Sequence, residues 1–281
     1  MLTPMTHEEL DRYADWAYRL ALDLTRSGYP TYADGIKTRA EFIAAARKGM
    51  DAENEEVLLF RVGDAVRGWI WWGWQPEERY AQPYSFLTES DTGEALAAFT
   101  AYAAARCPGC ALHMGFPAEN EQAVRWLDKH DFRLLDASVN HTLFFDRYAP
   151  REMPPSVSLM SGAEDEAAFR ALHTSDDLYW TAPRILANAE DWRVYLHRQE
   201  GVASAALYAK VAVGGWPEIF GMAGHVTEGA YRALLTACLN DCKALGCHHM
   251  TYFEEDETKL PILAELGCEV VSRYVCYQKV L

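Results

Sequence analysis

The sequence lacks any apolar run that approaches the roughly 18–20 residues of a membrane-spanning helix. Its first residues, Met1 to Met5, lead into an acidic segment and do not have the pattern of a secretory signal peptide. Basic residues are scarce, 26 Lys and Arg against 41 Asp and Glu, and they form no cluster that would bind a phosphate backbone. We therefore expect a cytoplasmic protein that binds neither membrane nor nucleic acid.

The seven cysteines are an odd number in a large chain without a secretory pattern, so we expect reduced thiols. Cys107 and Cys110 have the spacing of a zinc or redox pair. They follow a predicted helix C-terminus, however, where the helix dipole raises a thiol pKa instead of lowering it. A zinc site would also need about two more ligands. The sequence therefore predicts no metal.

A length of 281 residues is typical of about two domains, and a hydrophobic content of 50% provides ample core. The net charge of −15 is most simply a source of solubility. It is also compatible with attraction of a cationic substrate such as an amine, and the sequence leaves both interpretations open.

The two halves of the chain match without a gap at an offset of 136 residues. The matches run through helix, strand and helix patterns in one register, which indicates two copies of one α/β unit. An offset of this length is too long for a solenoid, so each copy should have its own sheet. The matched pairs include Gly93 and Gly229, Thr100 and Thr236, His113 and His249, and Leu127 and Leu263.

Periodicity and turn residues predict the same order of elements in both copies. The first should contain a helix capped by Thr6 and Glu9 that ends near Gly28, a helix at 38–48, strands at 57–62, 65–74 and 84–87, a helix at 93–106, a strand at 111–116, a helix at 120–130 and strands within 134–146. The second should contain a strand at 157–160, a helix capped by Ser161 and Glu164, strands at 193–199, 202–213 and 218–223, a helix at 230–245, a strand at 247–253, a helix at 257–266 and strands within 269–281. The first copy has no room for a strand before its opening helix. A proline-containing linker at 148–155 divides the predicted domains, 1–148 and 156–281.

This order resembles the GNAT acetyltransferase fold, and the chain is similar to a tandem GNAT protein. The resemblance implies a mixed α/β class, with two GNAT-like acyl-CoA N-acyltransferase domains in tandem. Its best local match runs from Asn120 to Phe132, where the family commonly has Asn, Ala three residues on, and Gly-Phe at eleven and twelve. Ala123 fits this pattern, Asp131 replaces the glycine, and Leu127 stands where many members have tyrosine. The second copy keeps the glycine but departs from the pattern at Asp256, Lys259 and Cys268.

In this family, a Gln/Arg-x-x-Gly-x-Gly/Ala loop at a helix start binds the pyrophosphate of acetyl-CoA through backbone N–H groups. The first copy offers Ser90 to Ala95, and the second offers Val226 to Tyr231. Neither has the Gln or Arg. The small residues favour the first loop, whereas its acidic residues, Glu89, Asp91 and Glu94, favour the second. The resemblance thus implies that Ser90, Gly93, Ala95 and Asn120 bind acetyl-CoA, with Gly229 as the alternative. A plain helix N-cap without ligand remains open for both loops.

The implied chemistry is direct attack of an amine on the acetyl thioester, with a base for the amine proton and often a tyrosine as acid. The tyrosine position holds Leu127 and Leu263, so Tyr84 is the candidate acid and Glu89 the candidate base in the first copy; Glu218 or His225 are candidate bases in the second. Tyr29 and Tyr32 lie on a loop that is either an acceptor wall or simply solvated. We expect an acetyltransferase for a small cationic amine; the alternative is a non-catalytic GNAT-like protein retained for ligand binding or assembly. Sequence leaves the acceptor and the oligomeric state undecided.

Overall fold

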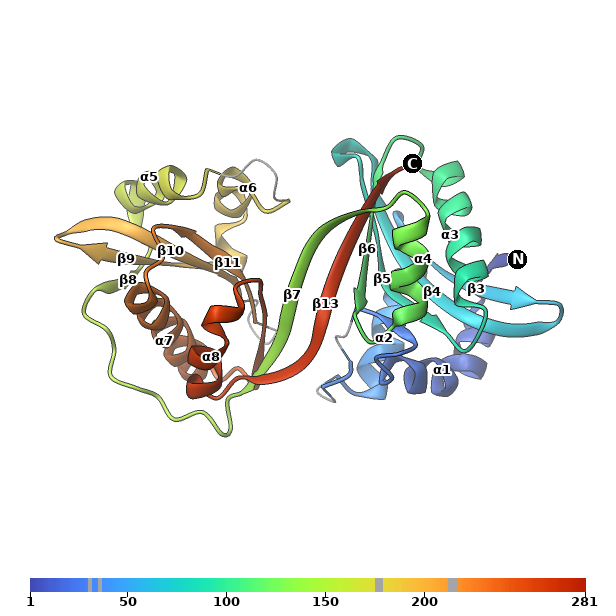
Figure 1. Ribbon diagram of the computed structural model, residues 1–281, viewed down its shortest axis with the longest axis horizontal. Helices are drawn as coiled ribbons and strands as arrows, with labels where there is room; N and C mark the ends of the chain where they lie inside the picture. The colour runs from blue at the N-terminus through green and yellow to red at the C-terminus, as the bar shows by residue number, and fades with distance from the viewer. Residues whose placement is uncertain (30–31, 35–36, 175–178, 212–216) are drawn as a thin grey trace. The chain divides into compact units, whose positions relative to one another are not determined.

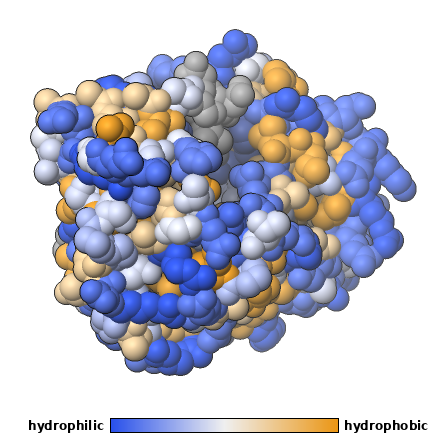
Figure 2. All heavy atoms as spheres, turned by 60° about the vertical axis from the view of Figure 1, so that its left-hand side comes forward, coloured by the Kyte–Doolittle hydropathy of each residue, from blue (hydrophilic) through white to orange (hydrophobic). Residues whose placement is uncertain are grey.

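The computed structural model describes residues 1–29, 32–34, 37–174, 179–211 and 217–281. The chain forms two compact units: unit 1 is Met1–Val139 with Val271–Leu281, and unit 2 is Asn140–Val270. In both units, helices alternate along the chain with strands of a mixed sheet, which confirms the expected α/β class (Figure 1). Among the described residues, no helix is long and apolar enough to cross a membrane. On the face drawn in Figure 2, hydrophilic side chains predominate and apolar ones form separate patches.

Unit 1 has a sheet with helices on both faces. Successive side chains of a strand point to opposite faces, and in this sheet both faces are apolar and must be covered. Leu59 and Trp69 point to one face and pack against the first two helices, whereas Leu58 and Ile70 point to the other. The strands in sheet order are β1 (Leu2–Pro4), β3 (Glu55–Val62), β4 (Ala65–Gln75), β5 (Tyr80–Thr88), β6 (Ala111–Pro117), β13 (Glu269–Val280) and β7 (Arg133–Phe144), and β2 (Ser27–Gly28) pairs with β5. The helices are α1 (His7–Ala21), α2 (Arg39–Met50), η1 (Pro76–Glu78), α3 (Thr92–Arg106) and α4 (Glu121–Lys129).

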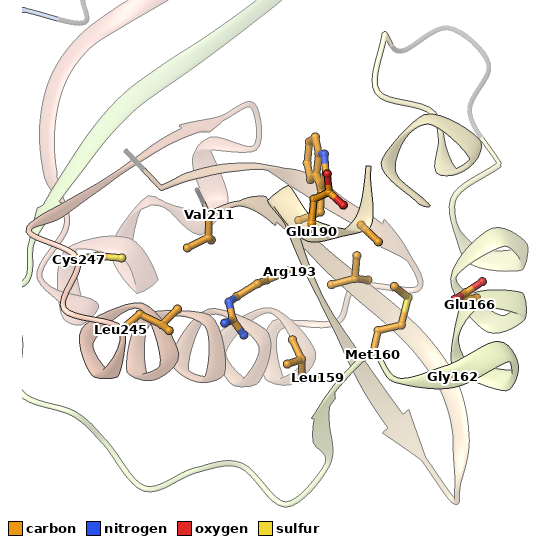
Figure 3. A pocket seen from close by; sticks show the side chains of 12 residues that line it. Leu159, Met160, Gly162, Glu166, Glu190, Arg193, Val211, Leu245 and Cys247 are labelled. Atoms are coloured by element: carbon orange, nitrogen blue, oxygen red, sulfur yellow. The ribbon is translucent and has the colours of Figure 1, made fainter. Parts of the chain in front are cut away.

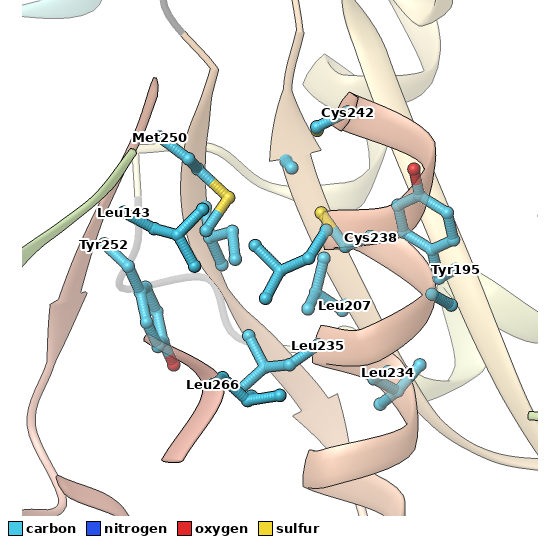
Figure 4. Packing of buried hydrophobic residues seen from close by; sticks show 14 of the residues in the cluster. Leu143, Tyr195, Leu207, Leu234, Leu235, Cys238, Cys242, Met250, Tyr252 and Leu266 are labelled. Carbon is cyan, nitrogen blue, oxygen red and sulfur yellow. The ribbon is translucent and has the colours of Figure 1, made fainter. Parts of the chain in front are cut away.

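Unit 2 repeats this arrangement. Its longest helix, α7, packs Leu235 and Cys238 against Leu207 and Met250 of the sheet (Figure 4). The strands are β8 (Val157–Leu159), β9 (Trp192–Gln199), β10 (Val202–Lys210), β11 (Glu218–Gly224) and β12 (His249–Glu254), next to the second part of β7. The helices are α5 (Gly162–Leu172), α6 (Ala182–Ala187), η2 (Ala189–Asp191), α7 (Glu228–Ala244), η3 (Glu257–Lys259) and α8 (Leu260–Leu266). The predicted end of the second hairpin, residues 212–213, lies outside the described residues.

The offset of 136 residues holds in the structure from α3 onward. The helix that begins at Thr92 corresponds to the one that begins at Glu228, and strand Arg133–Phe144 corresponds to Glu269–Val280. The opening helices do not follow the offset, since α1 begins at His7 and α5 at Gly162. The halves are therefore one unit repeated, with separate histories of insertion at their N-terminal ends.

Three sequence predictions about local structure are wrong. The first unit does have an opening strand, because Leu2–Pro4 pairs antiparallel with β3. Helix α1 ends at Ala21 and not near Gly28, because Ser27 and Gly28 pair with β5. The Thr6 capping box is confirmed. The Ser161 one is not, since Asp165 Oδ2 accepts the hydrogen bond from Ser161 N at 2.8 Å and the serine side chain caps nothing.

The C-terminal strand belongs to unit 1. Residues of β13 pair antiparallel with β6, from Tyr274 opposite Pro117 to Val280 opposite Ala111. The compact units therefore differ from the boundaries drawn on the sequence, 1–148 and 156–281, in residues 140–148 and 271–281. A hydrophobic pattern identifies a strand but not its partner. Whether the two sequence segments fold as independent domains stays a prediction.

Candidate functional site

In unit 1, the parallel strands β5 and β6 pair at their beginnings and then part. The ladder consists of Tyr80 opposite Ala111 and Ala81 opposite Leu112. Beyond this point, in the described part of the chain, no ladder joins residues 82–88 of β5 to residues 113–117 of β6. We call this stretch the strand gap. Strands β11 and β12 part in the same way after Ile219 and Tyr252. Each unit thus has two strand edges whose backbone groups need another partner.

Helix α3 begins directly after β5, and its first turn lacks a side-chain cap in the described structure. The N-cap residue, Asp91, has left-handed backbone angles of φ 58° and ψ 34°, and its side chain makes no capping hydrogen bond. A helix start of this kind presents unpaired N–H groups and the positive end of the helix dipole, which suits an anionic group. In unit 2, by contrast, Thr227 Oγ1 accepts from Ala230 N at 3.2 Å and caps α7.

Small side chains surround this helix start in unit 1, and large ones stand at the matching positions of unit 2. Ala95 and Ala118 correspond to Tyr231 and Glu254 at the offset of 136 residues. The phenol of Tyr231 donates to Glu254, and Tyr252 Oη also donates to Glu254 Oε2, at 2.9 Å. Burial, reinforced by the neighbouring tyrosine and carboxylate, raises the pKa of Tyr231. Unit 2 therefore places two phenols and a buried carboxylate where unit 1 has the apolar side chains of Ala95, Phe116 and Ala118.

This Tyr231–Glu254–Tyr252 cluster was not foreseen as a unit, although Tyr231 was expected to obstruct the second loop. A glutamate at the end of a largely buried strand was the available signal, because a buried carboxylate requires hydrogen-bond donors nearby. Asp256 N supplies a third donor, at 2.8 Å from Glu254 Oε1. The comparison of the two units favours the first loop as the donor site.

Ser90 and Gly93 lie at the start of α3, as predicted. Ser90 Oγ donates to Asp91 Oδ2 at 2.6 Å. A Cβ added at Gly93 would lie 3.1 Å from Trp126 Cδ1, so the indole of α4 covers the first turn of α3. Trp126 in turn stacks on His130 with ring centroids 4.0 Å apart. The helix start is thus bordered by a flat aromatic surface that sequence analysis did not single out.

Glu89, the candidate base, is paired. Its carboxylate accepts from Arg67 Nη1 at 2.6 Å and from Trp16 Nε1 at 3.2 Å. The Arg67 hydrogen bond, followed by that of Trp16, lowers the pKa of Glu89. Of the three carboxylates expected to repel a pyrophosphate, Glu89 is therefore balanced by a cationic partner. The same pairing makes Glu89 less able to take up a proton at neutral pH. The role of Glu89 as a base therefore stays a prediction, and this geometry does not support it.

Tyr84, the candidate acid, lies on the α1–α2 face of the sheet. Its ring is 5.1 Å from that of Trp71, and a Cβ at Gly73 would lie 2.5 Å from Tyr84 Oη. Burial, helped by the charge of Glu55, raises the pKa of Tyr84. The phenol therefore remains protonated at neutral pH, as an acid must be. It lies on the face of the sheet opposite α3.

Asn120, expected at the cofactor, has two structural contacts. Its Oδ1 accepts from Ala123 N at 3.3 Å and caps α4, and its Nδ2 donates to Ser27 O at 3.2 Å. The side chain is buried. The family-like helix motif from Asn120 onward therefore anchors α4 to a segment of the chain near residue 27.

That segment, residues 26–29, lies in the strand gap, and we call it the gap segment. Ser27 pairs with Leu87 and Gly28 with Phe86 of β5. On the other side, Tyr29 N donates to Gly115 O of β6 at 3.1 Å. Sequence analysis missed this, because Gly28 looked like the end of a helix. Tyr32, expected either as acceptor wall or solvated, is instead buried against Phe42 with ring centroids 5.3 Å apart.

A cavity of about 380 Å³ in unit 2 lies elsewhere. Its wall includes Trp192 and Arg193 at the start of β9 and Leu245 and Cys247 beyond the end of α7 (Figure 3). Arg193 Nη1 pairs with Asp241 at 3.0 Å. The 17 residues of α7 span about 25 Å, so the cavity is far from the Gly229 end of that helix. It is not part of either candidate donor loop.

Cys107 and Cys110 are buried, and burial, followed by the neighbouring thiol, raises the pKa of Cys107 to about 12. A protonated, buried thiol is a poor nucleophile and metal ligand. Within the described ranges, no three His, Cys, Asp or Glu side chains converge as metal ligands.

No family model and no curated protein matches the sequence. The fold does have solved counterparts. A GCN5-related N-acetyltransferase from Sphaerobacter thermophilus superposes with a TM-score of 0.64 at 12% identity, over 99% of this chain and 95% of that one. One from Kribbella flavida has a TM-score of 0.56 at 18% identity, over 84% and 94%. This chain therefore has the GCN5-related N-acetyltransferase fold.

The tandem form of that fold is also represented. A tandem GNAT protein from the clavulanic acid biosynthesis pathway superposes with a TM-score of 0.53 at 16% identity, over 99% of this chain and 98% of that one. The expected tandem GNAT architecture is confirmed at the level of the fold.

Proposed function

We propose that this protein is an acetyltransferase that binds acetyl-CoA at the start of α3 in unit 1 and acetylates a small cationic amine. The uncapped first turn of α3, beside Ala95 and the strand gap, is the observation that carries the proposal. The fold shared with N-acetyltransferases supports it.

The residues of unit 1 have separable roles in this proposal. The N–H groups of the first turn and the helix dipole hold the pyrophosphate, and the indole of Trp126, which lies against Gly93, borders the site. Acetyl-CoA supplies the activated acetyl group. We assign Tyr84 the role of general acid, because it lies on the part of β5 that borders the strand gap and because burial raises its pKa. The net charge of −15 raises the local concentration of a cationic acceptor.

A matched pair of variants tests which unit binds the donor. Gly93→Glu and Gly229→Glu each add a carboxylate to the first turn of an equivalent helix, where a negative charge is compatible with helix stability. Because a Cβ at Gly93 would also lie 3.1 Å from Trp126 Cδ1, Gly93→Ala, which adds the Cβ without the charge, is the steric control. In calorimetry with acetyl-CoA, we expect G93E to weaken binding at least tenfold and G229E to leave it unchanged. Circular dichroism confirms that both variants fold. Loss of binding in G229E alone would move the site to unit 2.

The alternative, a non-catalytic GNAT-like protein kept for ligand binding or assembly, is favoured by two observations. The gap segment lies between β5 and β6 in unit 1, and in unit 2 the bonded pair Tyr231 and Glu254 stands where unit 1 has Ala95 and Ala118. If this alternative holds, the wild type will show no heat of binding with millimolar acetyl-CoA, and neither glutamate variant will differ from it.

A further inference from the structure

The gap segment is bonded to both edges of the strand gap. Thr88 N donates to Arg26 O at 3.0 Å on the β5 side, and Tyr29 N donates to Gly115 O at 3.1 Å on the β6 side. Asn120 Nδ2 adds a bond to Ser27 O from the start of α4. The segment therefore provides the backbone partners that the parted strands do not provide for each other.

The fit of the segment depends on having almost no side chain at its centre. A Cβ added at Gly28 would lie 3.1 Å from each of three atoms: Gly115 O, Phe116 Cε1 and Phe86 Cβ. A contact this tight against backbone and core side chains means that a larger residue must displace its neighbours. The gap is thus occupied by bare backbone.

The forces that hold the segment are mostly polar. The side chain of Arg26 is 44% exposed and pairs with Asp23 at 3.5 Å, while Ser27 Oγ donates to Asp23 O at 2.9 Å. None of residues 26–28 contributes an apolar side chain to the core. Each hydrogen bond adds only a modest net stability, and departure of the segment removes no apolar side chain from the core, although it uncovers Phe86 and Phe116.

The far end of the segment is conformationally strained. Tyr29 has φ of 50°, in the left-handed region that bulky residues rarely adopt. Its phenol donates to Gln82 Oε1 at 3.2 Å, and its ring lies 5.7 Å from that of Tyr274. Release of the segment would relieve this backbone strain, which lowers the free energy needed to open the gap.

We propose that the gap segment is an internal competitor of acetyl-CoA. It is an autoinhibitory strand that must leave before the acetyl group can pass from the α3 side of the sheet to the face on which Tyr84 lies. This inference rests on the proposed function. A protein whose binding-competent state is a minority binds its ligand more weakly in proportion to that fraction. Freeing the segment should therefore strengthen binding.

Two variants free the segment by different means. Gly28→Val expels it sterically, and Arg26→Ala removes only an exposed side chain that ties it to Asp23 and to the Glu89 carbonyl. Arg47→Ala, which removes an equally exposed arginine of α2 that pairs with Asp11 of α1, is the matched control. R26A keeps the test valid if G28V does not fold.

Two measurements are made on each protein: amide hydrogen exchange at Thr88 and Tyr29 by NMR, and the affinity for acetyl-CoA by calorimetry. We expect both amides to exchange faster in G28V and R26A. We expect G28V to bind acetyl-CoA at least tenfold more tightly, a change of about 1.4 kcal/mol, R26A to shift in the same direction, and R47A to match the wild type.

Three results would overturn the inference, and they point to different causes. If exchange accelerates and affinity stays the same, the segment does not compete with the donor. If the wild type already binds tightly while both amides remain protected, the proposed function survives and autoinhibition fails. If the freed variants show fast exchange and no binding at millimolar acetyl-CoA, the proposed function itself is wrong.

Discussion

The packing of the C-terminal strand on unit 1 gives a sharp stability prediction at Gly115. A Cβ at this position would lie 2.0 Å from Tyr274 Oη and 2.7 Å from Tyr274 Cζ. Tyr274 belongs to β13, more than 150 positions later in the chain, and its ring is buried. Gly115→Ala must therefore displace a large buried side chain. Overpacking of this kind costs about 1–3 kcal/mol of unfolding free energy.

A double-mutant cycle separates this contact from a general effect on β6. Tyr274→Ala alone should cost about 3–5 kcal/mol, since it leaves a cavity the size of an aromatic ring. In the double variant, the new methyl group no longer meets the phenol, so the two costs should not add. We expect the double variant to be more stable than the sum predicts by about 0.5–3 kcal/mol.

Urea unfolding followed by tryptophan fluorescence is the appropriate assay, because six of the nine tryptophans lie in unit 1. Gly229→Ala is the control, since nothing lies within 4 Å of the added Cβ. It should be neutral or slightly stabilising. If G115A unfolds like the wild type, or if the two costs simply add, Tyr274 does not pack on Gly115 and residues 271–281 do not complete unit 1.

Two further predictions concern buried polar groups. Tyr231→Phe removes a hydrogen bond to the buried Glu254 and should lower the free energy of unfolding in urea by about 1.5–3 kcal/mol. In the control, Tyr277→Phe, the lost bond goes to the exposed Asp128 at 2.7 Å, and the cost should be about 1 kcal/mol or less. Equal costs would contradict a special role for the buried cluster. Burial lowers the pKa of His113 to about 4, so the unfolded chain takes up a proton first as the pH falls from about 6.5 to 4. The free energy of unfolding should therefore decline over that window and decline less in His113→Gln; identical pH profiles would show that His113 is not buried in its neutral form.

The order of helices and strands followed from the sequence because it depends on local periodicity. The helix predicted at 93–106 is α3 at Thr92–Arg106, and the strand predicted at 111–116 is β6 at Ala111–Pro117. The two-fold repeat could also be predicted from the sequence, since matched identical residues such as Gly93 and Gly229 occupy the same position in equivalent helices. Apolar spacing and turn residues act over a few positions, and a single chain displays them directly.

The residues of the candidate site could be predicted only in part from the sequence. Ser90, Gly93 and Ala95 were found because a helix start after a strand has a local pattern. One part of their electrostatic environment could not be predicted, because the partner of Glu89 is Arg67, from a neighbouring strand. The Tyr231–Glu254 pair joins the first turn of one helix to the end of a strand 23 positions later. Side-chain partners of this kind depend on how elements stack.

Tertiary structure alone decided two features of unit 1. Strand β13 pairs with β6 and not with its own half of the chain, and the gap segment lies between β5 and β6 although it was expected to end a helix. Both are pairings of backbone with backbone across long stretches of sequence. Every strand edge offers the same N–H and C=O groups, so the residues that form it do not specify which segment will fill it.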